Sequence, residues 1–167
     1  MTIVRPAKPE DVRRIKKIQR IVWLDTYVNS DFDITKEDIE AKDFESPKKI
    51  REMEESIRKK GKWHLFVAEE SEIVVGFSGI GREADGFIQG GTYVLPKFQK
   101  KGIGTLLVKR TQELAKGSAK ISCEVVAFNL GGIMFWEKRG FFVIGESEYE
   151  LPTGKKLPLI KMVLLRR

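Results

Sequence analysis

Residues 93–105 of the chain read YVLPKFQKKGIGT, a strand-like ending that leads through a glycine-containing turn directly into a helix. Gly102 and Gly104 let the backbone approach an anion closely, and the free N–H groups of a helix's first turn point toward it. The helix dipole and the charges of Lys100 and Lys101 favour negative charge at the same place. The segment therefore favours a phosphate-binding turn, although a plain strand-to-helix turn with solvated lysines fits the glycine spacing as well.

Two other phosphate motifs describe this stretch less well. A Walker A loop requires the pattern GxxxxGK followed by Ser or Thr, and the dinucleotide-binding fingerprint requires a third glycine that is absent here. The turn alone does not identify the fold, so we next consider the helices and strands that flank it.

Helical and strand-like segments alternate after the turn. Apolar residues at helical spacing predict a helix over 102–116, and a β-branched run predicts a buried strand over 121–127. Asn129 can cap a further helix that runs to Arg139. The remaining pattern predicts two last strands, over 141–149 and 157–165.

Strands dominate the segment before the turn. Residues 63–68, 73–80 and 87–95 have the period of strands, with a hairpin turn at Asp85-Gly86 between the last two. Strands connected by such short turns are antiparallel neighbours. We therefore expect an antiparallel meander here.

The first third of the chain is predicted to be mainly helical. A short strand over 2–5 precedes an amphipathic helix over 10–27. Residues 35–38 have the form of a capping box that begins a short second helix. Ser46-Pro47 has the form of an N-cap and a first helical residue, and Gly61 is expected to end this third helix.

These elements occur in the order strand, three helices, three strands, helix, strand, helix and two strands. The order predicts an α+β fold with a mixed, mostly antiparallel central sheet of about seven strands flanked by helices. No linker rich in Gly, Ser or Pro and no internal repeat divides the chain. We therefore expect residues 1–167 to form a single domain.

The composition excludes several classes of protein. Hydrophobic residues make up 41% and charged residues 33%, which is typical of a soluble globular protein and not of a disordered chain. No apolar stretch approaches the roughly 20 residues of a membrane span, and charges occupy the place of a signal peptide's apolar centre, so we expect a cytoplasmic protein. Cys123 is the only cysteine and His64 the only histidine. We therefore expect no disulfide and no metal site.

The charge balance favours an anionic partner. Lys and Arg number 31 against 24 Asp and Glu, which gives a formal charge of +7 and makes a nucleic acid or a phosphorylated cofactor easier to attract. Both signs are interspersed, which is typical of solvated helix faces. The sequence has no helix-turn-helix, zinc-finger or RNA-recognition signature, so we do not expect a nucleic-acid partner.

Two blocks of the sequence have the spacing of known family motifs. Gln99, Gly102 and Gly104 match the pattern Q/R-x-x-G-x-G/A after a strand that ends like Tyr-Val-x-Pro. The pattern Asn-x-x-Ala-x-x-Phe-Tyr-x-x-x-Gly-Phe is approximated at the same spacing by Asn129, Gly132, Phe135, Trp136, Gly140 and Phe141. On both blocks and on the predicted order of elements, the chain resembles the GCN5-related N-acetyltransferases, which transfer an acetyl group from acetyl-CoA to an amine.

The resemblance implies acetyl-CoA as the cosubstrate, with no metal. The N–H groups from Lys101 through Thr105 would hold the CoA pyrophosphate, and Val94 and Leu95 would pair with the pantetheine arm like an added strand. Asn129 would also bond that arm, and Lys138 would lie near the adenosine phosphates. The implied cofactor-binding residues are Tyr93, Val94, Leu95, Gln99, Lys100, Lys101, Gly102, Ile103, Gly104, Thr105, Asn129 and Lys138.

Direct attack of an amine on a thioester requires loss of a proton from the amine and a donor for the oxyanion. The resemblance assigns the donor role to the backbone N–H of Val94. The family's usual general-acid tyrosine is replaced by Trp136, and the glutamate often found on the preceding strand is missing from residues 87–91. We therefore expect Tyr149 to take a catalytic role, with Asp85 or a water chain assisting deprotonation.

In this family the helices after the first strand and the last two strands usually wall the acceptor pocket. The resemblance therefore implies acceptor contacts from Trp23, Tyr27, Asp31 and Asp33, because aromatic faces and carboxylates suit a cationic amine. The first helix and the tail over 154–164 are similar to those of PaiA-type polyamine acetyltransferases. We therefore expect spermidine or spermine as the acceptor.

Other functions stay open on the sequence alone. The same fold can acetylate a protein N-terminus or a lysine side chain. A chain that has lost its chemistry, as Trp136 permits, can instead be a noncatalytic acyl-CoA or nucleic-acid binding protein. The last strands also offer an edge that could pair with a second copy in a homodimer.

Overall fold

The computed structural model describes residues 1–167, and the predicted elements occur in the predicted order, which confirms the α+β class. The strands are β1 (Thr2–Pro6), β2 (Trp63–Glu70), β3 (Ile73–Glu83), β4 (Gly86–Val94), β5 (Lys120–Val126), β6 (Phe142–Glu150) and β7 (Lys156–Leu165). The helices are α1 (Val12–Tyr27), α2 (Lys36–Glu40), α3 (Pro47–Arg58), α4 (Ile103–Leu114) and α5 (Leu130–Glu137). Single 3-10 turns cover Pro9–Asp11, Ser30–Phe32 and Pro96–Phe98.

The predicted caps of three helices are present. Thr35 and Asp38 bond each other's backbone reciprocally at the start of α2, as a capping box requires. The hydroxyl of Ser46 accepts from the N–H of Lys49 at 3.3 Å at the start of α3. Asn129 caps α5 in the same way. Short-range side-chain bonds therefore fix where these helices begin.

Two predicted boundaries differ in detail. α3 ends at Arg58, three residues before Gly61, and the left-handed conformation expected of the glycine is adopted by Lys60 with φ 46°. The turn between β3 and β4 occupies residues 84–85, one position earlier than predicted, since Gly86 already pairs with Glu83.

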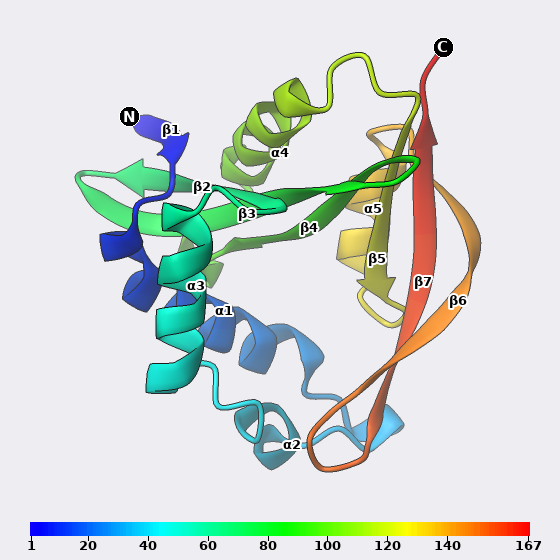
Figure 1. Ribbon diagram of the computed structural model, residues 1–167. Helices are drawn as coiled ribbons and strands as arrows, with labels where there is room; N and C mark the ends of the chain where they lie inside the picture. Colours follow the sequence, from blue (N-terminus) through cyan, green and yellow to red (C-terminus); the bar gives the residue numbers. More distant parts are fainter.

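The seven strands form one sheet in the order β1-β2-β3-β4-β5-β7-β6. Every neighbouring pair is antiparallel except β4 and β5, which are parallel and pair only at Phe87–Ile121 and Ile88–Ser122. Figure 1 shows β4 and β5 running apart from this common end. The sheet is therefore opened between its two central strands.

A β-bulge in β4 lies just beyond this pairing. The register shifts between Ser78 and Ile80, so Gly79 of β3 lies opposite two residues of β4, 90 and 91. A bulge bends its strand and increases the local twist. The bulge therefore directs the second half of β4 away from β5.

The buried side chain of Gln89 bonds the groups around the bulge. Its amide nitrogen donates to the carbonyl of Gly79 at 2.9 Å and to the hydroxyl of Ser78 at 3.0 Å. Its oxygen accepts from the hydroxyl of Thr111 on α4 at 2.9 Å. This satisfied network attaches the bend of β4 to α4.

Helices cover both faces of the sheet. Figure 1 shows α4 above strands β2–β4 and α1 and α3 on the opposite side, with α5 beside β5. Residues from α1, α4 and the strands between them form the largest core cluster. Cys123 lies in a second cluster around β5 and α5, where burial raises the pKa of its thiol to about 12 and keeps it protonated.

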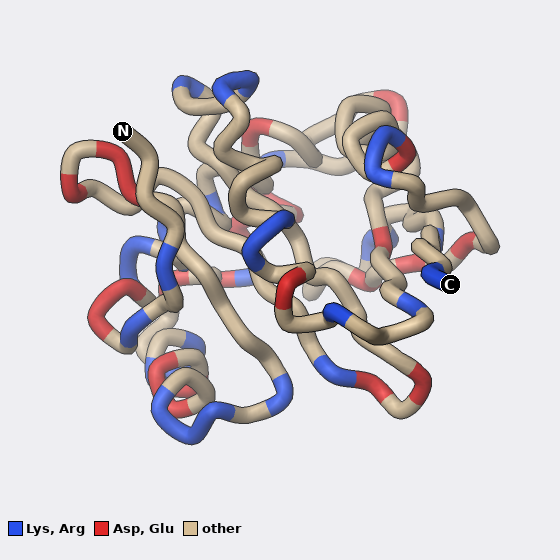
Figure 2. Tube along the Cα trace, turned by 90° about the horizontal axis from the view of Figure 1, so that it is seen from above, with Lys and Arg blue, Asp and Glu red and all other residues tan.

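Charged residues of both signs are spread along the chain. Figure 2 shows Lys and Arg segments interspersed with Asp and Glu over the whole trace. None of the helices combines the length and the apolar character needed to cross a membrane.

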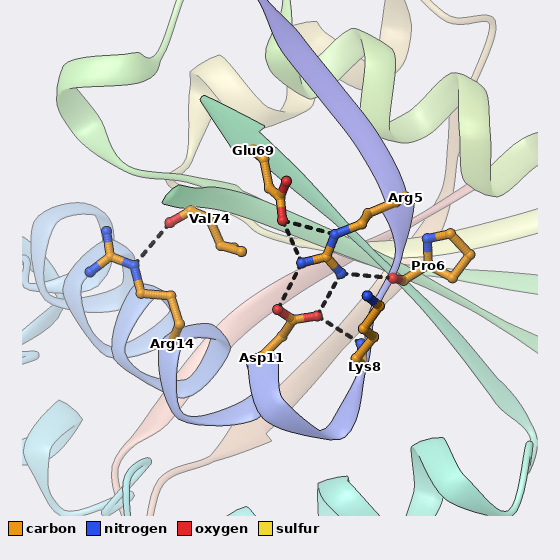
Figure 3. Close-up of polar contacts among 7 residues, drawn as sticks. All are labelled: Arg5, Pro6, Lys8, Asp11, Arg14, Glu69 and Val74. Carbon is orange, nitrogen blue, oxygen red and sulfur yellow. Dashed lines mark hydrogen bonds and ion pairs between the residues drawn. The ribbon is translucent and has the colours of Figure 1, made fainter. Parts of the chain in front are cut away.

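An ion-pair network fixes the N-terminal strand (Figure 3). The guanidinium of Arg5 makes two bonds to the carboxylate of Asp11, at 2.8 and 2.9 Å, and its Nε donates to Glu69 on β2 at 2.8 Å. The same Asp11 carboxylate accepts from the N–H of Lys8 at 2.7 Å. Burial acts to raise the pKa of Asp11, but the bonds from Arg5 and Lys8 outweigh it and hold that pKa below its usual value. The network therefore ties β1, β2 and the start of α1 together.

Candidate functional site

A cavity of about 490 Å³ lies between the diverging parts of β4 and β5. Six parts of the chain supply its walls, namely α1, β4, the turn before α4, the start of α4, β5 and the segment of α5. The lining residues are Val22, Thr26, Tyr27, Gly91, Thr92, Tyr93, Val94, Gln99, Lys100, Gly102, Gly104, Thr105, Glu124, Val125, Asn129, Gly131, Gly132, Phe135 and Trp136.

The turn before α4 presents a row of free backbone N–H groups. Those of residues 100–105 donate to no backbone or side-chain acceptor. Thr35, Ser46 and Asn129 cap α2, α3 and α5 with side-chain oxygens, whereas Gly102 at the N-cap of α4 has no side chain to do so. The N-terminus of this 12-residue helix is therefore left open for an external acceptor.

The backbone of this turn has a concave form. Lys100 and Gly102 both adopt positive φ, 60° and 82°. Left-handed residues of this kind bring successive N–H groups to one side, which makes an anion-binding concavity. A Cβ on Gly102 would meet no protein atom within 4 Å, so the space in front of the turn is free of protein. The predicted phosphate-binding turn thus has suitable geometry.

The end of β4 offers a free strand edge to the cavity. The N–H of Leu95 donates to the carbonyl of Val75 on β3 at 2.9 Å, so the preceding residue, Val94, directs its own backbone groups to the opposite edge. There the side chain of Gln99 donates to the carbonyl of Val94 at 2.8 Å. Gln99 therefore satisfies the carbonyl at the end of β4, and the N–H of Val94 remains open toward the cavity.

The residues at the two ends of α5 place an amide and a guanidinium near the turn, Asn129 just before the helix and Arg139 just after it. The oxygen of Asn129 accepts from the N–H of Gly132 at 3.1 Å, which leaves its NH₂ group as a donor at the cavity wall. Arg139 stacks on the ring of Phe135 at 3.5 Å and donates to the hydroxyl of Thr105. The sequence reasoning missed Arg139 and chose Lys138 instead, which is exposed and does not line the cavity.

Glu124 is the one carboxylate among the lining residues. It lies on β5, and one of its oxygens accepts from the hydroxyl of Ser147 on β6 at 2.7 Å. The sequence reasoning sought a glutamate on the strand before the turn and missed this one. A usable signal was present, because Glu124 interrupts a β-branched run predicted as a buried strand.

Aromatic side chains form the wall toward α1. Tyr27 and Tyr93 line the cavity, and burial raises the pKa of both phenols, so each stays protonated at neutral pH. Trp23 donates its indole N–H to the hydroxyl of Tyr93 at 3.2 Å. Tyr149 lies behind Trp23, outside the lining, and its hydroxyl accepts from the ammonium group of Lys42.

The two aspartates predicted to contact the acceptor lie away from the cavity. Asp31 is exposed in the 3-10 turn after α1. The carboxylate of Asp33 lies 3.3 Å from the ammonium of Lys155, which also pairs with Asp38 at 3.0 Å. The charge of Asp33 is therefore already compensated within the chain.

Most of the predicted cofactor residues gather at the cavity. Leu95 and Ile103 are buried in the core cluster around α4, and the side chain of Lys101 lies over the ring of Phe98. Trp136, at the place of the family's tyrosine, lines the cavity with its indole packed on Phe135 and Phe141. The predicted cofactor residues that line the cavity are Tyr93, Val94, Gln99, Lys100, Gly102, Gly104, Thr105 and Asn129.

Several known acetyltransferases share the fold of this chain. PaiA N-acetyltransferase from Thermoplasma acidophilum in complex with coenzyme A has a TM-score of 0.82 at 20% identity, with 99% of each chain covered. YncA, a putative acetyltransferase from Salmonella typhimurium with acetyl-CoA, has a TM-score of 0.67 at 22% identity, covering 98% of this chain and 93% of that one. The ribosomal-protein-S18-alanine N-acetyltransferase from Escherichia coli has a TM-score of 0.66 at 16% identity, covering 99% and 94%.

No curated protein matches the sequence. Residues 17–141 match the family model described as the acetyltransferase (GNAT) family. Because this match covers most of the chain, and the fold and the open turn agree with it, the chain belongs to the GNAT acetyltransferase family.

Proposed function

We propose that the chain is an acetyl-CoA-dependent N-acetyltransferase that transfers the acetyl group to a primary amine of a small polyamine such as spermidine or spermine. The observation that carries the proposal is the row of free N–H groups over residues 100–105, which opens beside the free edge of β4. CoA combines a diphosphate with an extended amide chain. A helix N-terminus suits the first part and a strand edge suits the second.

The residues around the turn fit acetyl-CoA. The free amides would bind the pyrophosphate, and the NH₂ group of Asn129 would donate to the pantetheine arm beside the end of β4. Arg139 contacts Thr105 at the start of α4 and would add positive charge beside the phosphates.

Glu124 is the best candidate for the base. An alkylamine has a pKa of about 10, so it is mostly protonated at neutral pH and must lose a proton before it attacks. Glu124 offers a carboxylate in the cavity, and Ser147 holds one of its oxygens while the other stays free. The carboxylate would accept the ammonium proton directly or through one water.

The remaining steps need only modest help. The attacking nitrogen forms a C–N bond to the thioester carbon, and the N–H of Val94 would donate to the resulting oxyanion. The adduct nitrogen then loses its second proton to water, the C–S bond breaks and CoA leaves as a thiolate. The thiol's pKa is about 8.5, by analogy with cysteine, so water or protonated Glu124 can return a proton to it. Tyr27 lines the cavity and Tyr149 does not, which favours Tyr27 over Tyr149 for a contact with the leaving group. Replacement of the family's tyrosine by Trp136 is therefore tolerable.

The polyamine part of the proposal rests on the acceptor side of the cavity. The aromatic rings of Tyr27 and Tyr93 and the carboxylate of Glu124, which line the cavity, suit a primary amine. The structural similarity to PaiA N-acetyltransferase is in line with the resemblance of the first helix and the tail to PaiA-type polyamine acetyltransferases.

Release of the CoA thiol from acetyl-CoA tests the proposal. Purified protein should turn over spermidine and spermine with higher kcat/KM than a lysine peptide, a peptide with a free N-terminal alanine or an aminoglycoside. Turnover of a peptide but of no polyamine would identify a peptide as the acceptor and leave the transferase assignment intact. Absence of CoA binding in calorimetry would overturn the transferase assignment itself.

A further inference from the structure

An ammonium group of the chain itself lies among aromatic rings beside the cavity. The Nζ of Lys42, in the loop between α2 and α3, lies 4.3 Å from the ring centre of Tyr149, 4.7 Å from that of Trp23 and 5.5 Å from that of Phe44. It also donates to the hydroxyl of Tyr149. We call Trp23, Phe44 and Tyr149 the aromatic cage. Rings at these distances attract a cation through their quadrupoles.

The aromatic cage adjoins the cavity directly. The ring centre of Trp23 lies 4.9 Å from that of Tyr27, and its indole N–H bonds the hydroxyl of Tyr93. Tyr27 and Tyr93 both line the cavity. An amine at the cavity is thus separated from the cage by one layer of side chains. A flexible molecule with several amino groups can span that separation.

Lys42 is held in the cage without a carboxylate. No acidic side chain lies within ion-pair distance of its ammonium. Two other lysines, Lys16 and Lys49, lie close to Lys42. Lys49 donates its ammonium to the carbonyl of Lys42, and the pKa of Lys16 is lowered by burial and then by the charges of Lys49 and Lys42, with Glu52 acting in the opposite direction.

This environment makes Lys42 exchangeable. Its release breaks a cation–π contact and one hydrogen bond, not an ion pair, and the freed ammonium regains full hydration. A second ammonium that enters as Lys42 leaves keeps the number of positive charges in the cage unchanged. The flanking lysines therefore do not oppose the exchange as they would oppose an added cation.

We propose that the aromatic cage is the binding site for a non-reacting ammonium group of the acceptor, and that Lys42 occupies it as an internal cation until the acceptor displaces it. The inference rests on the proposed function, since it concerns the second amino group of a polyamine whose first amino group is acetylated. It also explains how a chain of net charge +7 can hold a polycation without an acidic patch.

Two substitutions of the same residue test the exchange. Lys42→Ala empties the cage, whereas Lys42→Arg keeps a cation in it. Binding of spermidine to the CoA complex, measured by calorimetry, should be roughly three- to thirtyfold tighter in Lys42→Ala, the range of a partly desolvated cation–π contact. Lys42→Arg and the control Lys36→Ala, which removes an exposed lysine of α2, should bind like the wild type.

Kinetics and a double variant complete the test. The KM for spermidine should fall in Lys42→Ala, while the KM for butylamine, which has no second amino group, stays unchanged. Adding Tyr149→Leu to Lys42→Ala should remove the gain, because one wall of the cage is lost. Unchanged or weaker spermidine binding in Lys42→Ala, or an equal gain in Lys36→Ala, would overturn the cage assignment.

The outcomes also separate this inference from the proposed function. Tighter spermidine binding in Lys42→Ala without thiol release from any amine would leave the cage in place and remove the transferase. Normal thiol release, together with unchanged spermidine binding in Lys42→Ala, would leave the transferase in place and remove the cage.

Discussion

Replacing Glu124 by Gln tests the assignment of the base most directly. Glutamine keeps the shape of the side chain, and its carbonyl oxygen can still accept from Ser147. Because Glu124 is exposed, the free energy of unfolding should change by no more than about 0.5 kcal/mol. Loss of a general base typically costs about 10²- to 10⁴-fold in rate. We therefore expect a folded variant with kcat/KM for spermidine reduced by that factor at pH 7.

The pH dependence distinguishes a lost base from a lost contact. In the wild type, kcat/KM should stay nearly flat below the amine's pKa of about 10, because the carboxylate takes the ammonium proton. In Glu124→Gln only the free amine reacts, so kcat/KM should rise about tenfold per pH unit between pH 7 and 9. Glu146→Gln, on exposed β6, is the matched control. Parallel pH profiles for wild type and Glu124→Gln, or more than half of the wild-type rate at pH 7, would refute the assignment.

Three further changes address the turn, the bulge and the N-terminal network. Gly102→Ala places a Cβ at φ 82°, so thermal melting should show a loss of about 1–2 kcal/mol and calorimetry should show weaker CoA binding; unchanged CoA affinity would separate the turn from the cofactor. Gln89→Leu leaves the carbonyl of Gly79 without its donor, so urea unfolding should show a loss of about 2–4 kcal/mol, and an unchanged midpoint would contradict the role of the network. Asp11→Asn should cost about 1–3 kcal/mol at pH 7. Because Arg5 holds the pKa of Asp11 below its unfolded value, this contribution is present above pH 4 or so and is lost as the pH falls through the folded pKa. Urea titrations between pH 3 and 7 should therefore show a smaller pH dependence in the variant, and identical slopes would exclude the linkage.

The order of elements follows from local rules that act within a few residues. The caps at Thr35, Ser46 and Asn129 each depend on a bond to a backbone N–H three residues away, so the sequence predicts them well. The exception at the end of α3 is also local, since Lys60 and not Gly61 adopts the left-handed conformation. A lysine in this conformation has a steric cost that a glycine does not have, so the sequence predicts the glycine and not Lys60 at this position.

The site depends on contacts between distant segments and is therefore less predictable. The glycine turn is a continuous motif, and its N–H groups are free, as a phosphate-binding turn requires. Glu124 faces the cavity only because β4 bends away from β5 at a bulge, and the bulge is held by Gln89 from one strand and Thr111 from a helix. The place of Tyr149 in the last hairpin predicts a catalytic role for its hydroxyl. In the structure this hydroxyl instead bonds Lys42, which lies in a loop more than 100 residues earlier in the chain, and the sequence pattern does not reveal such a contact.

The unpaired backbone groups of the turn before α4 and of the end of β4 lie beside the strand pair with the fewest paired residues. β4 and β5 join the two halves of the sheet through only two residue pairs, at Phe87 and Ile88. α4 packs on one half and α5 on the other, and Arg139 bridges them through Thr105. A CoA molecule held by the amides of α4, the edge of β4 and Asn129 of α5 would contact both halves at once, and it has no such site in the unfolded chain. Binding should therefore stabilise the fold by about 2.7 kcal/mol at a concentration one hundred times Kd. In the gap, the backbone groups at the end of β4 lack the strand partner that a closed sheet would provide, and the pantetheine arm of the cosubstrate would take the place of that strand.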